Sequence, residues 1–152
     1  EPELFHPGDL DYIHSVERIS HLSNVISING GVQLDLMGQE NAESTGTRQL
    51  SGVGGQMDFL EGAFRSRGGK GFICINSSRV TKDGERRSNI LATIPGGSTI
   101  SAPRTMIQYV ATEYGIASLS GKTLRERAEA MASIAHPDFR EELMKYAREN
   151  YK

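Results

Sequence analysis

Three closely spaced glycines, Gly52, Gly54 and Gly55, stand immediately before a stretch with helical spacing and are the most informative residues in the chain. The apolar face of the expected helix carries Phe59, Leu60, Ala63 and Phe64. A glycine-rich turn before a helix directs several backbone N–H groups toward one point, with the positive end of the helix dipole behind them. Such a site holds an anion, or an oxygen that becomes anionic during a reaction.

The glycine spacing differs from two common phosphate-binding loops. The ATPase loop requires Lys followed by Ser or Thr after the glycines, where this chain has Met57-Asp58. The dinucleotide pattern G-x-G-x-x-G also fails, because Met57 stands where the third glycine would fall. A plain strand-to-helix turn without a ligand is therefore the alternative reading of this segment.

Other reactive residue types form no pattern typical of a site. Cys74 is the single cysteine, so an internal disulfide is excluded, and its apolar surroundings in residues 71–75 predict a buried structural thiol. His6, His21 and His136 have no metal-ligand spacing with one another or with Cys74. We therefore predict no metal site.

Length and composition indicate one globular domain. The chain has 152 residues, of which 37% are hydrophobic and 24% charged, and these values suit a domain with a full core. The net charge of −2 gives no basic excess for a nucleic-acid or membrane surface. We find no apolar run of membrane-spanning length and no signal-peptide pattern. A reducing cytoplasm fits the single cysteine.

Hydrophobic periodicity in the first half predicts a helix at 16–22 and strands at 25–28 and 32–36. We expect the two strands to form a hairpin across Gly30-Gly31. Residues 72–75 are of types that favour β-strands, and none of them is charged. This pattern predicts a central strand buried on both faces.

The middle of the chain predicts further strands. Residues 42–46 would extend the sheet, and Asp83-Gly84 within the charged stretch 81–87 is a hairpin turn signal. Strands are also expected at 89–94 and 107–112.

Two helices are expected to close the chain. Thr123 and Glu126 form a capping-box pattern, and Pro137 suits the first turn of the last helix. The apolar faces carry Leu124, Ala128, Met131, Ala132 and Ala135 in the first helix, and Phe139, Leu143 and Ala147 in the second. Strands mixed with helices predict an α/β layered fold.

Several segments in this order resemble the C-terminal domain of the acetyl-CoA hydrolase/transferase family. They include SGVGGQMDF (51–59), RGGK (67–70), TEYGIA (112–117) and HPDFR (136–140), with further matches at 24–39, 42–46 and 124–128. The resemblance extends from about residue 5 to about residue 143. The family includes 4-hydroxybutyrate, butyryl-CoA:acetate and succinyl-CoA:acetate CoA-transferases.

The resemblance implies the α/β fold of the CoA-transferase superfamily, a mixed central sheet flanked by helices, with residues 1–152 forming the C-terminal domain. Family enzymes carry another domain on the N-terminal side and use a nucleophilic glutamate that lies upstream of the region resembled here. Glu40, Glu43 and Glu61 do not match that position. We therefore expect this chain alone to lack the nucleophile and to form no glutamyl-CoA adduct.

The resemblance also assigns catalytic positions. Gly55 matches the glycine whose backbone N–H serves the oxyanion hole, while Gly52 and Gly54 shape that turn. His14 stands where the family usually has asparagine, a donor to the thioester or oxyanion oxygen; a surface-loop histidine is the alternative. Glu113 matches a glutamate that helps to organise the active site, and a solvent-exposed strand-end glutamate is its alternative.

Further residues are candidates for contact with CoA, and one of them, Arg104, matches a family arginine. The candidates at the glycine turn are Gly52 and Gln56. The other candidates are Arg67 and Lys70, whose positive charges suit CoA phosphates, and Arg104. A solvated loop after a helix is an equally good account of Arg67 and Lys70. Met106 and Gln108 depart from the usual family residues near Arg104.

The expected function is that of a CoA-transferase domain that moves CoA between a short-chain acyl-CoA and a carboxylate. An acyl-CoA hydrolase and a non-catalytic CoA- or partner-binding module are the alternatives. Coenzyme A would be a substrate rather than a permanently bound cofactor. The expected partners are the enzyme's own N-terminal domain and a second copy in a homo-oligomer, with no nucleic acid and no membrane.

Overall fold

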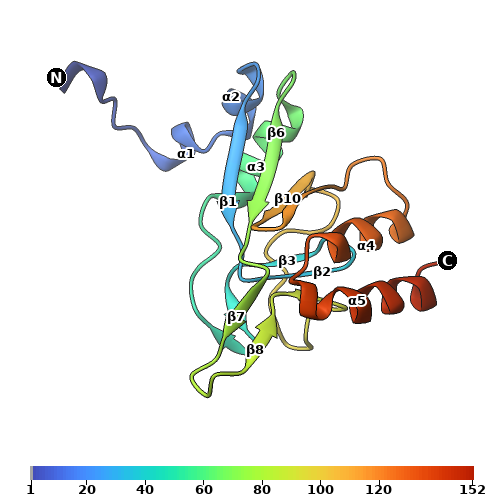
Figure 1. Ribbon diagram of the computed structural model, residues 1–152. Coiled ribbons are helices and arrows are strands. Elements are labelled where there is room, and N and C mark those ends of the chain that lie inside the picture. The colour runs from blue at the N-terminus through green and yellow to red at the C-terminus, as the bar shows by residue number, and fades with distance from the viewer. Residues whose placement is uncertain (1) are drawn as a thin grey trace.

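The computed structural model describes residues 2–152 as an α/β fold with a four-stranded main sheet (Figure 1). The strand order is β1 (Ile26–Gly30), β6 (Lys70–Cys74), β10 (Tyr109–Thr112) and β11 (Gly115–Ser118). The first three strands are parallel, and β11 is antiparallel to β10. The expected α/β class and mixed central sheet are therefore confirmed.

Smaller elements surround this sheet. A three-stranded sheet has the order β3 (Glu40–Asn41), β2 (Gln33–Asp35) and β9 (Ile90–Leu91). Two antiparallel ribbons pair β4 (Ser44–Thr45) with β5 (Arg48–Gln49), and β7 (Ser78–Val80) with β8 (Arg86–Ser88). The helices are η1 (Pro2–Leu4), α1 (Leu10–Ile13), α2 (Val16–His21), α3 (Gln56–Arg65), α4 (Leu124–Ser133) and α5 (Pro137–Asn150).

Helix α3 lies between β1 and β6 in the chain and packs against both strands. Its carboxyl end is held near the beginning of β1, because the Ser66 hydroxyl donates to the Leu22 carbonyl at 2.6 Å and accepts from the Val25 amide at 3.2 Å. Leu60 and Ala63 form its buried face. The amino end of α3 therefore lies toward the opposite edge of the sheet, where the parallel strands end.

The helices and the sheets enclose one hydrophobic core. Its fully buried members include Leu60 of α3, Ile73 of β6, Val110 of β10 and Met131 of α4. These residues come from helices and from one face of the main sheet, so the helices share a single sheet face. In Figure 1, α2 and α3 lie behind β1 and β6.

The predicted hairpin at 25–36 is wrong. β1 pairs in parallel with β6, and after Gly31 the chain passes into the second sheet, where the Val32 amide donates to the Asn41 carbonyl at 2.9 Å. The reason is that a strand buried on one face finds its partner through the β1–α3–β6 crossover, which local periodicity does not encode. Residues 44–45 likewise form a separate ribbon instead of extending the main sheet.

The prediction that residues 72–75 are buried on both faces is also wrong. Burial alternates along β6: Ile73 is buried, while Phe72 is partly exposed and Cys74 is exposed. The thiol of Cys74 is therefore not a buried structural group, because its side of the sheet has no covering helix in the described chain.

Several local signals are confirmed. Thr123 and Glu126 form the capping box at the start of α4, and Pro137 begins α5. The Asp83-Gly84 turn joins β7 to β8. Two expected apolar-face residues, Phe64 and Leu124, are exposed.

Arg127 of α4 joins three loops through a nearly buried guanidinium. Its Nε donates to the Met37 carbonyl at 2.9 Å, Nη1 to Leu119 at 2.8 Å and Nη2 to Arg104 at 2.8 Å. Burial lowers the pKa of Arg127, as does the nearby Arg104 charge, while Asp35 opposes the shift. The planar fork of donors suits three diverging carbonyls in a way that an ammonium does not.

Replacing Arg127 with lysine is expected to destabilise the fold by about 2–4 kcal/mol, because an ammonium cannot reach all three carbonyls. Arg125→Lys on the same helix is the matched control, since Arg125 is an exposed partner of Glu129. Its cost should stay within about 0.5 kcal/mol. Urea unfolding measures both, and equal costs would contradict the role assigned to Arg127.

Candidate functional site

The glycine turn forms the amino end of α3. Gly54 has a φ of +59°, and Gly55 is the N-cap residue of the helix with φ −96° and ψ 12°. A glycine cap has no side chain to cover the first amides of the helix, in contrast to Ser or Asp. Backbone donors and the helix dipole are thus presented at the carboxyl edge of the parallel strands, where open α/β sheets commonly bind ligands.

His14, which follows α1, packs directly on this turn. A Cβ built at Gly55 would lie 2.1 Å from His14 Cε1 and 2.3 Å from Nδ1, so only glycine leaves room for the imidazole. The ring also makes an edge contact with Phe59, with centroids 4.9 Å apart. The structure therefore brings together His14 and Gly55, which are 41 positions apart in the sequence.

Asp58, in the first turn of α3, faces the same imidazole. His14 Nδ1 lies 3.4 Å from Asp58 Oδ2, and this buried nitrogen makes no hydrogen bond to any residue between 2 and 152. An adjacent carboxylate favours the proton on Nδ1. When the imidazole is neutral, Nε2 is then an acceptor; when it is protonated, Nε2 is a donor.

Gln56, the first residue of α3, connects the turn to a buried carboxyl group. Its Nε2 donates to Glu40 Oε2, and Glu40 is completely buried in β3. Glu40 Oε1 has no hydrogen-bond partner among residues 2–152, and a Cβ at Gly31 would lie 2.8 Å from it. Burial raises the pKa of Glu40 from 4.5 to about 7, the bond from Gln56 lowers it, and Glu43 raises it further.

Glu113 follows β10 and is held by Ser77, which follows β6. The Ser77 amide donates to Glu113 Oε2 at 2.9 Å, and the Ser77 hydroxyl donates to Oε1 at 2.6 Å. Glu113 is exposed; its slight desolvation acts to raise its pKa, but the two bonds from Ser77 and the nearby His136 lower the pKa below its ordinary value. Glu113 is therefore a fixed carboxylate at the carboxyl edge of the strands.

The candidate cations Arg67 and Lys70 lie beyond the carboxyl end of α3, away from Gly55. Arg67 Nη2 donates to Ser23 Oγ at 3.3 Å, and Lys70 begins β6. A helix of 10 residues is about 15 Å long at 1.5 Å per residue. The structure thus separates these cations from the glycine turn by the length of α3.

Arg104 occupies a third location, beside the loops that Arg127 joins. Its Nη1 lies 3.4 Å from Met37 Sδ, and it lines a cavity of about 340 Å³ with Phe64 and Lys122. Gln108, one of the residues that depart from the family pattern, accepts the Gly71 amide through Oε1 at 2.7 Å. This contact gives Gln108 a structural role between β6 and the segment before β10.

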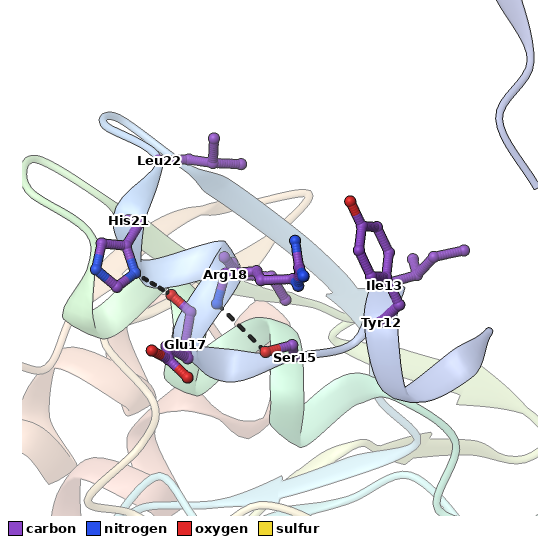
Figure 2. A pocket seen from close by; sticks show the side chains of 8 residues that line it. Tyr12, Ile13, Ser15, Glu17, Arg18, His21 and Leu22 are labelled. Carbon is purple, nitrogen blue, oxygen red and sulfur yellow. Dashed lines mark hydrogen bonds between the residues drawn. The ribbon is translucent and has the colours of Figure 1, made fainter. Parts of the chain in front are cut away.

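A cavity of about 660 Å³ lies between α1 and α2 (Figure 2). Tyr12 and Arg18 line it, with the Arg18 guanidinium 3.8 Å from the centre of the Tyr12 ring. Figure 2 shows His21 bonded to the Glu17 carbonyl of the same helix. No pair of lining side chains forms a nucleophile and base, so the chemistry is better placed at Gly55.

Two features are absent from the described part of the chain. Between residues 2 and 152, no group of three or more His, Cys, Asp or Glu side chains is arranged to hold a metal. Within the same span, none of the helices combines the length and apolarity needed to cross a bilayer.

Sequence reasoning missed the parts played by Asp58 and Glu40. Asp58 was visible three positions after Gly55, a spacing that puts it in the first helical turn. Glu40 gave no such signal, because its burial depends on Gln56, Gly31 and the second sheet. Only the assembled fold shows that this carboxyl group contacts the turn.

Known proteins resemble the chain over nearly its whole length. The sequence model of the acetyl-CoA hydrolase/transferase C-terminal domain matches residues 3–147. Butyryl-CoA:acetate CoA-transferase from Anaerostipes caccae is 46% identical over 138 residues, which are 91% of this chain and 31% of that protein. The chain thus spans about a third of the length of such a relative.

Solved structures agree in fold. RipA from Yersinia pestis has a TM-score of 0.80 and 38% identity, covering 91% of this chain and 30% of that one. A 4-hydroxybutyrate CoA-transferase from Porphyromonas gingivalis has a TM-score of 0.72 and 39% identity, covering 93% of this chain and 30% of that one.

Gly55→Ala is expected to displace the His14 ring and cost about 1–2 kcal/mol of stability through overpacking. The backbone of Gly55 allows alanine, so the clash alone carries the cost. Gly52→Ala is the matched control, because no atom lies within 4 Å of a Cβ there. In a His14→Ala background the penalty of Gly55→Ala should disappear; an unchanged penalty in urea unfolding would refute the packing argument.

Glu40 should make stability depend on pH. Its folded pKa of about 7 lies above the ordinary 4.5, so its contribution is intact below about pH 4.5 and is lost as the pH rises through 7. Glu40→Gln is expected to raise the thermal midpoint by several degrees at pH 8, a gain of about 1–3 kcal/mol, and to change little at pH 5. The exposed Glu141→Gln is the control, and the same gain at both pH values would contradict this assignment.

Proposed function

The chain belongs to the acetyl-CoA hydrolase/transferase family, and we propose that it supplies the oxyanion-binding and CoA-binding part of a CoA-transferase. The proposed reaction moves CoA between a short-chain acyl-CoA, such as acetyl-, butyryl- or 4-hydroxybutyryl-CoA, and a free carboxylate. The observation that carries this proposal is the His14 imidazole seated on Gly55 at the amino end of α3.

The nucleophile is proposed to be a glutamate in a region upstream of residue 1. Its carboxylate attacks the thioester carbonyl, and the tetrahedral intermediate expels CoA as a thiolate, leaving an acyl-glutamyl anhydride. The thiolate then attacks the glutamyl carbonyl, forming glutamyl-CoA and releasing the first acid. A second carboxylate repeats the steps in reverse, so the enzyme passes through a covalent intermediate.

This chain would stabilise the oxyanion in each of those steps. The Gly55 amide is the proposed first donor, supported by the α3 dipole, and an N–H at Nε2 of the His14 ring is the proposed second. Gly54 sets the turn, and Gly52 leaves its approach open to a bulky ligand. Preorganised donors of this kind contribute because they need no rearrangement while the negative charge develops.

The remaining predicted residues fit a long ligand better than a compact one. Gln56 and Glu113 lie toward the carboxyl edge of the strands, whereas Arg67 and Lys70 lie one helix length away. CoA separates its thiol from its phosphates by the pantetheine arm, so one molecule can reach from the turn to distant cations. We assign Arg67 and Lys70 to phosphate contacts, with Arg104 as the other candidate.

Hydrolysis by the same site is the second candidate function, and the His14–Asp58 pair favours it. With the proton on Nδ1 facing Asp58, neutral His14 presents an unprotonated Nε2 that can remove a proton from water. Water would then attack in place of the acceptor acid. A non-catalytic binding module is the third candidate, and a native mass near 16.6 kDa would support it.

The surroundings of the proposed enzyme follow the family resemblance. We propose a cytoplasmic protein in which the chain is joined to its own N-terminal domain, and a homo-oligomer of the complete polypeptide. CoA and acyl-CoA would act as substrates, with no permanently bound cofactor.

The test uses the full natural polypeptide with acetyl-CoA and butyrate, 4-hydroxybutyrate, propionate or succinate, and identifies products by mass spectrometry. A new acyl-CoA is the expected result and names the acceptor. Release of free CoA at the same rate with and without acid would instead identify a hydrolase. Failure of both reactions would refute the enzymatic proposal.

The role of His14 is tested in the same assay. His14→Ala should lower kcat by about 10²–10³-fold, as does removal of an oxyanion donor in other enzymes. His14→Asn, which restores the donor usual in the family, should retain most transfer. His21→Ala is the control, because His21 contacts the Glu17 carbonyl of its own helix, α2; if His14→Ala also leaves kcat unchanged, His14 is not the donor.

A further inference from the structure

One face of the main sheet has no covering layer within the described chain. The strand register places the same face of each strand in line: Ile28 lies beside Phe72, and Phe72 beside Tyr109. The apolar members of this face, here called the open face, are Ile26, Ile28, Phe72, Tyr109, Ala111 and Ile116. The Phe72 and Tyr109 rings stack with centroids 4.8 Å apart.

The exposures confirm that this face is bare. Ile28 is 69% exposed, Ile116 63% and Ile26 52%, although each is a β-branched residue in the middle or at the start of a strand. On the other face of the sheet, Ile73 and Val110 are fully buried and belong to the hydrophobic core. The sheet thus has one packed side and one apolar side in solvent.

Such a surface is unusual for parallel strands, which in α/β proteins are covered on both faces. A continuous exposed apolar patch marks a surface that contacts another layer of protein. Among the strand residues that the structure describes on the open face, Lys70 alone is charged, and it stands at the beginning of β6. The occupant must therefore be apolar, because an acidic peptide or a nucleic acid would find one cation only.

The edge strand β1 also suggests that another protein layer contacts the sheet. Within residues 2–152, β1 has a hydrogen-bonded neighbour on one side only, and its five residues carry no charge and no proline. Natural edge strands usually carry charged residues or proline, which prevent pairing with a strand of another chain. In addition, α1 and the preceding residues extend away from the body of the domain beside β1 (Figure 1).

We propose that the open face is the docking surface for the domain that precedes this one in the same polypeptide, which covers it with an apolar layer. The inference rests on the proposed function only in requiring a longer polypeptide. Its support is the length of the relatives, of which this chain spans 31%, together with the apolar character of the face. The known relative is thus long enough to provide the missing layer.

Cys74 reports on this contact, because its thiol is exposed on the open face. In the full natural polypeptide, we expect maleimide to label Cys74 at least about 100-fold more slowly than in urea, since labelling requires the layers to separate. Mass spectrometry of the peptide containing Cys74 gives the rate. Val80→Cys in the same sample is the control, because Val80 is 59% exposed on the β7–β8 ribbon and a thiol at that position should label rapidly.

Labelling of native Cys74 as fast as the thiol introduced by Val80→Cys would overturn the proposal. Protection that disappears on dilution to the monomer would also overturn it, by assigning the face to a second copy. A second measurement uses charge: Ile28→Asp should lower the thermal midpoint of the full polypeptide, whereas Val80→Asp should not. Neither measurement depends on catalysis, so a failed transfer assay leaves this proposal intact, and equal midpoints would refute it.

Discussion

The parallel pairing of β1 with β6 is the constraint on which the rest of the domain depends. Two adjacent parallel strands require a crossover, and here α3 supplies it with its carboxyl end tied to the start of β1 through Ser66. The helix must then run against the strands, which brings its glycine turn to their carboxyl edge. His14, Glu40 and Glu113 reach that edge from separate segments only because this crossover defines it.

Two carboxyl groups lie close to the glycine turn, and the fold reduces the negative charge that they place there. An oxyanion is destabilised by nearby carboxylates, yet Asp58 and Glu40 both approach the amino end of α3. Asp58 faces the His14 ring, with its Oδ2 3.4 Å from Nδ1. Glu40 is buried, and its raised pKa of about 7 keeps much of it neutral near that pH. The surroundings of the glycine turn are therefore less negative than the residue types suggest.

Local signals in the sequence predicted the elements better than their partners. The capping box at Thr123, the Asp83-Gly84 turn and the helix after Gly55 are short-range features, and all three are present. The 25–36 hairpin failed because pairing depends on contacts far along the chain. The prediction that Cys74 is buried was wrong for a different reason. An uncharged strand sequence predicts burial on both faces whether or not this chain provides the second covering layer. The family resemblance pointed to Gly55 and His14, which the structure places in contact, but it could not reveal that Glu40 contacts Gln56.

The three carbonyl contacts of Arg127 also bear on the order in which the chain folds. The partners of this guanidinium include Met37, 90 residues earlier, so a long loop must close before the contact forms. Contacts of such sequence separation slow folding, because the entropy of closure is lost before any bond is gained. During synthesis, the turn after β2 leaves the ribosome well before the helix that anchors it. Until α4 forms, the second sheet lacks that anchor.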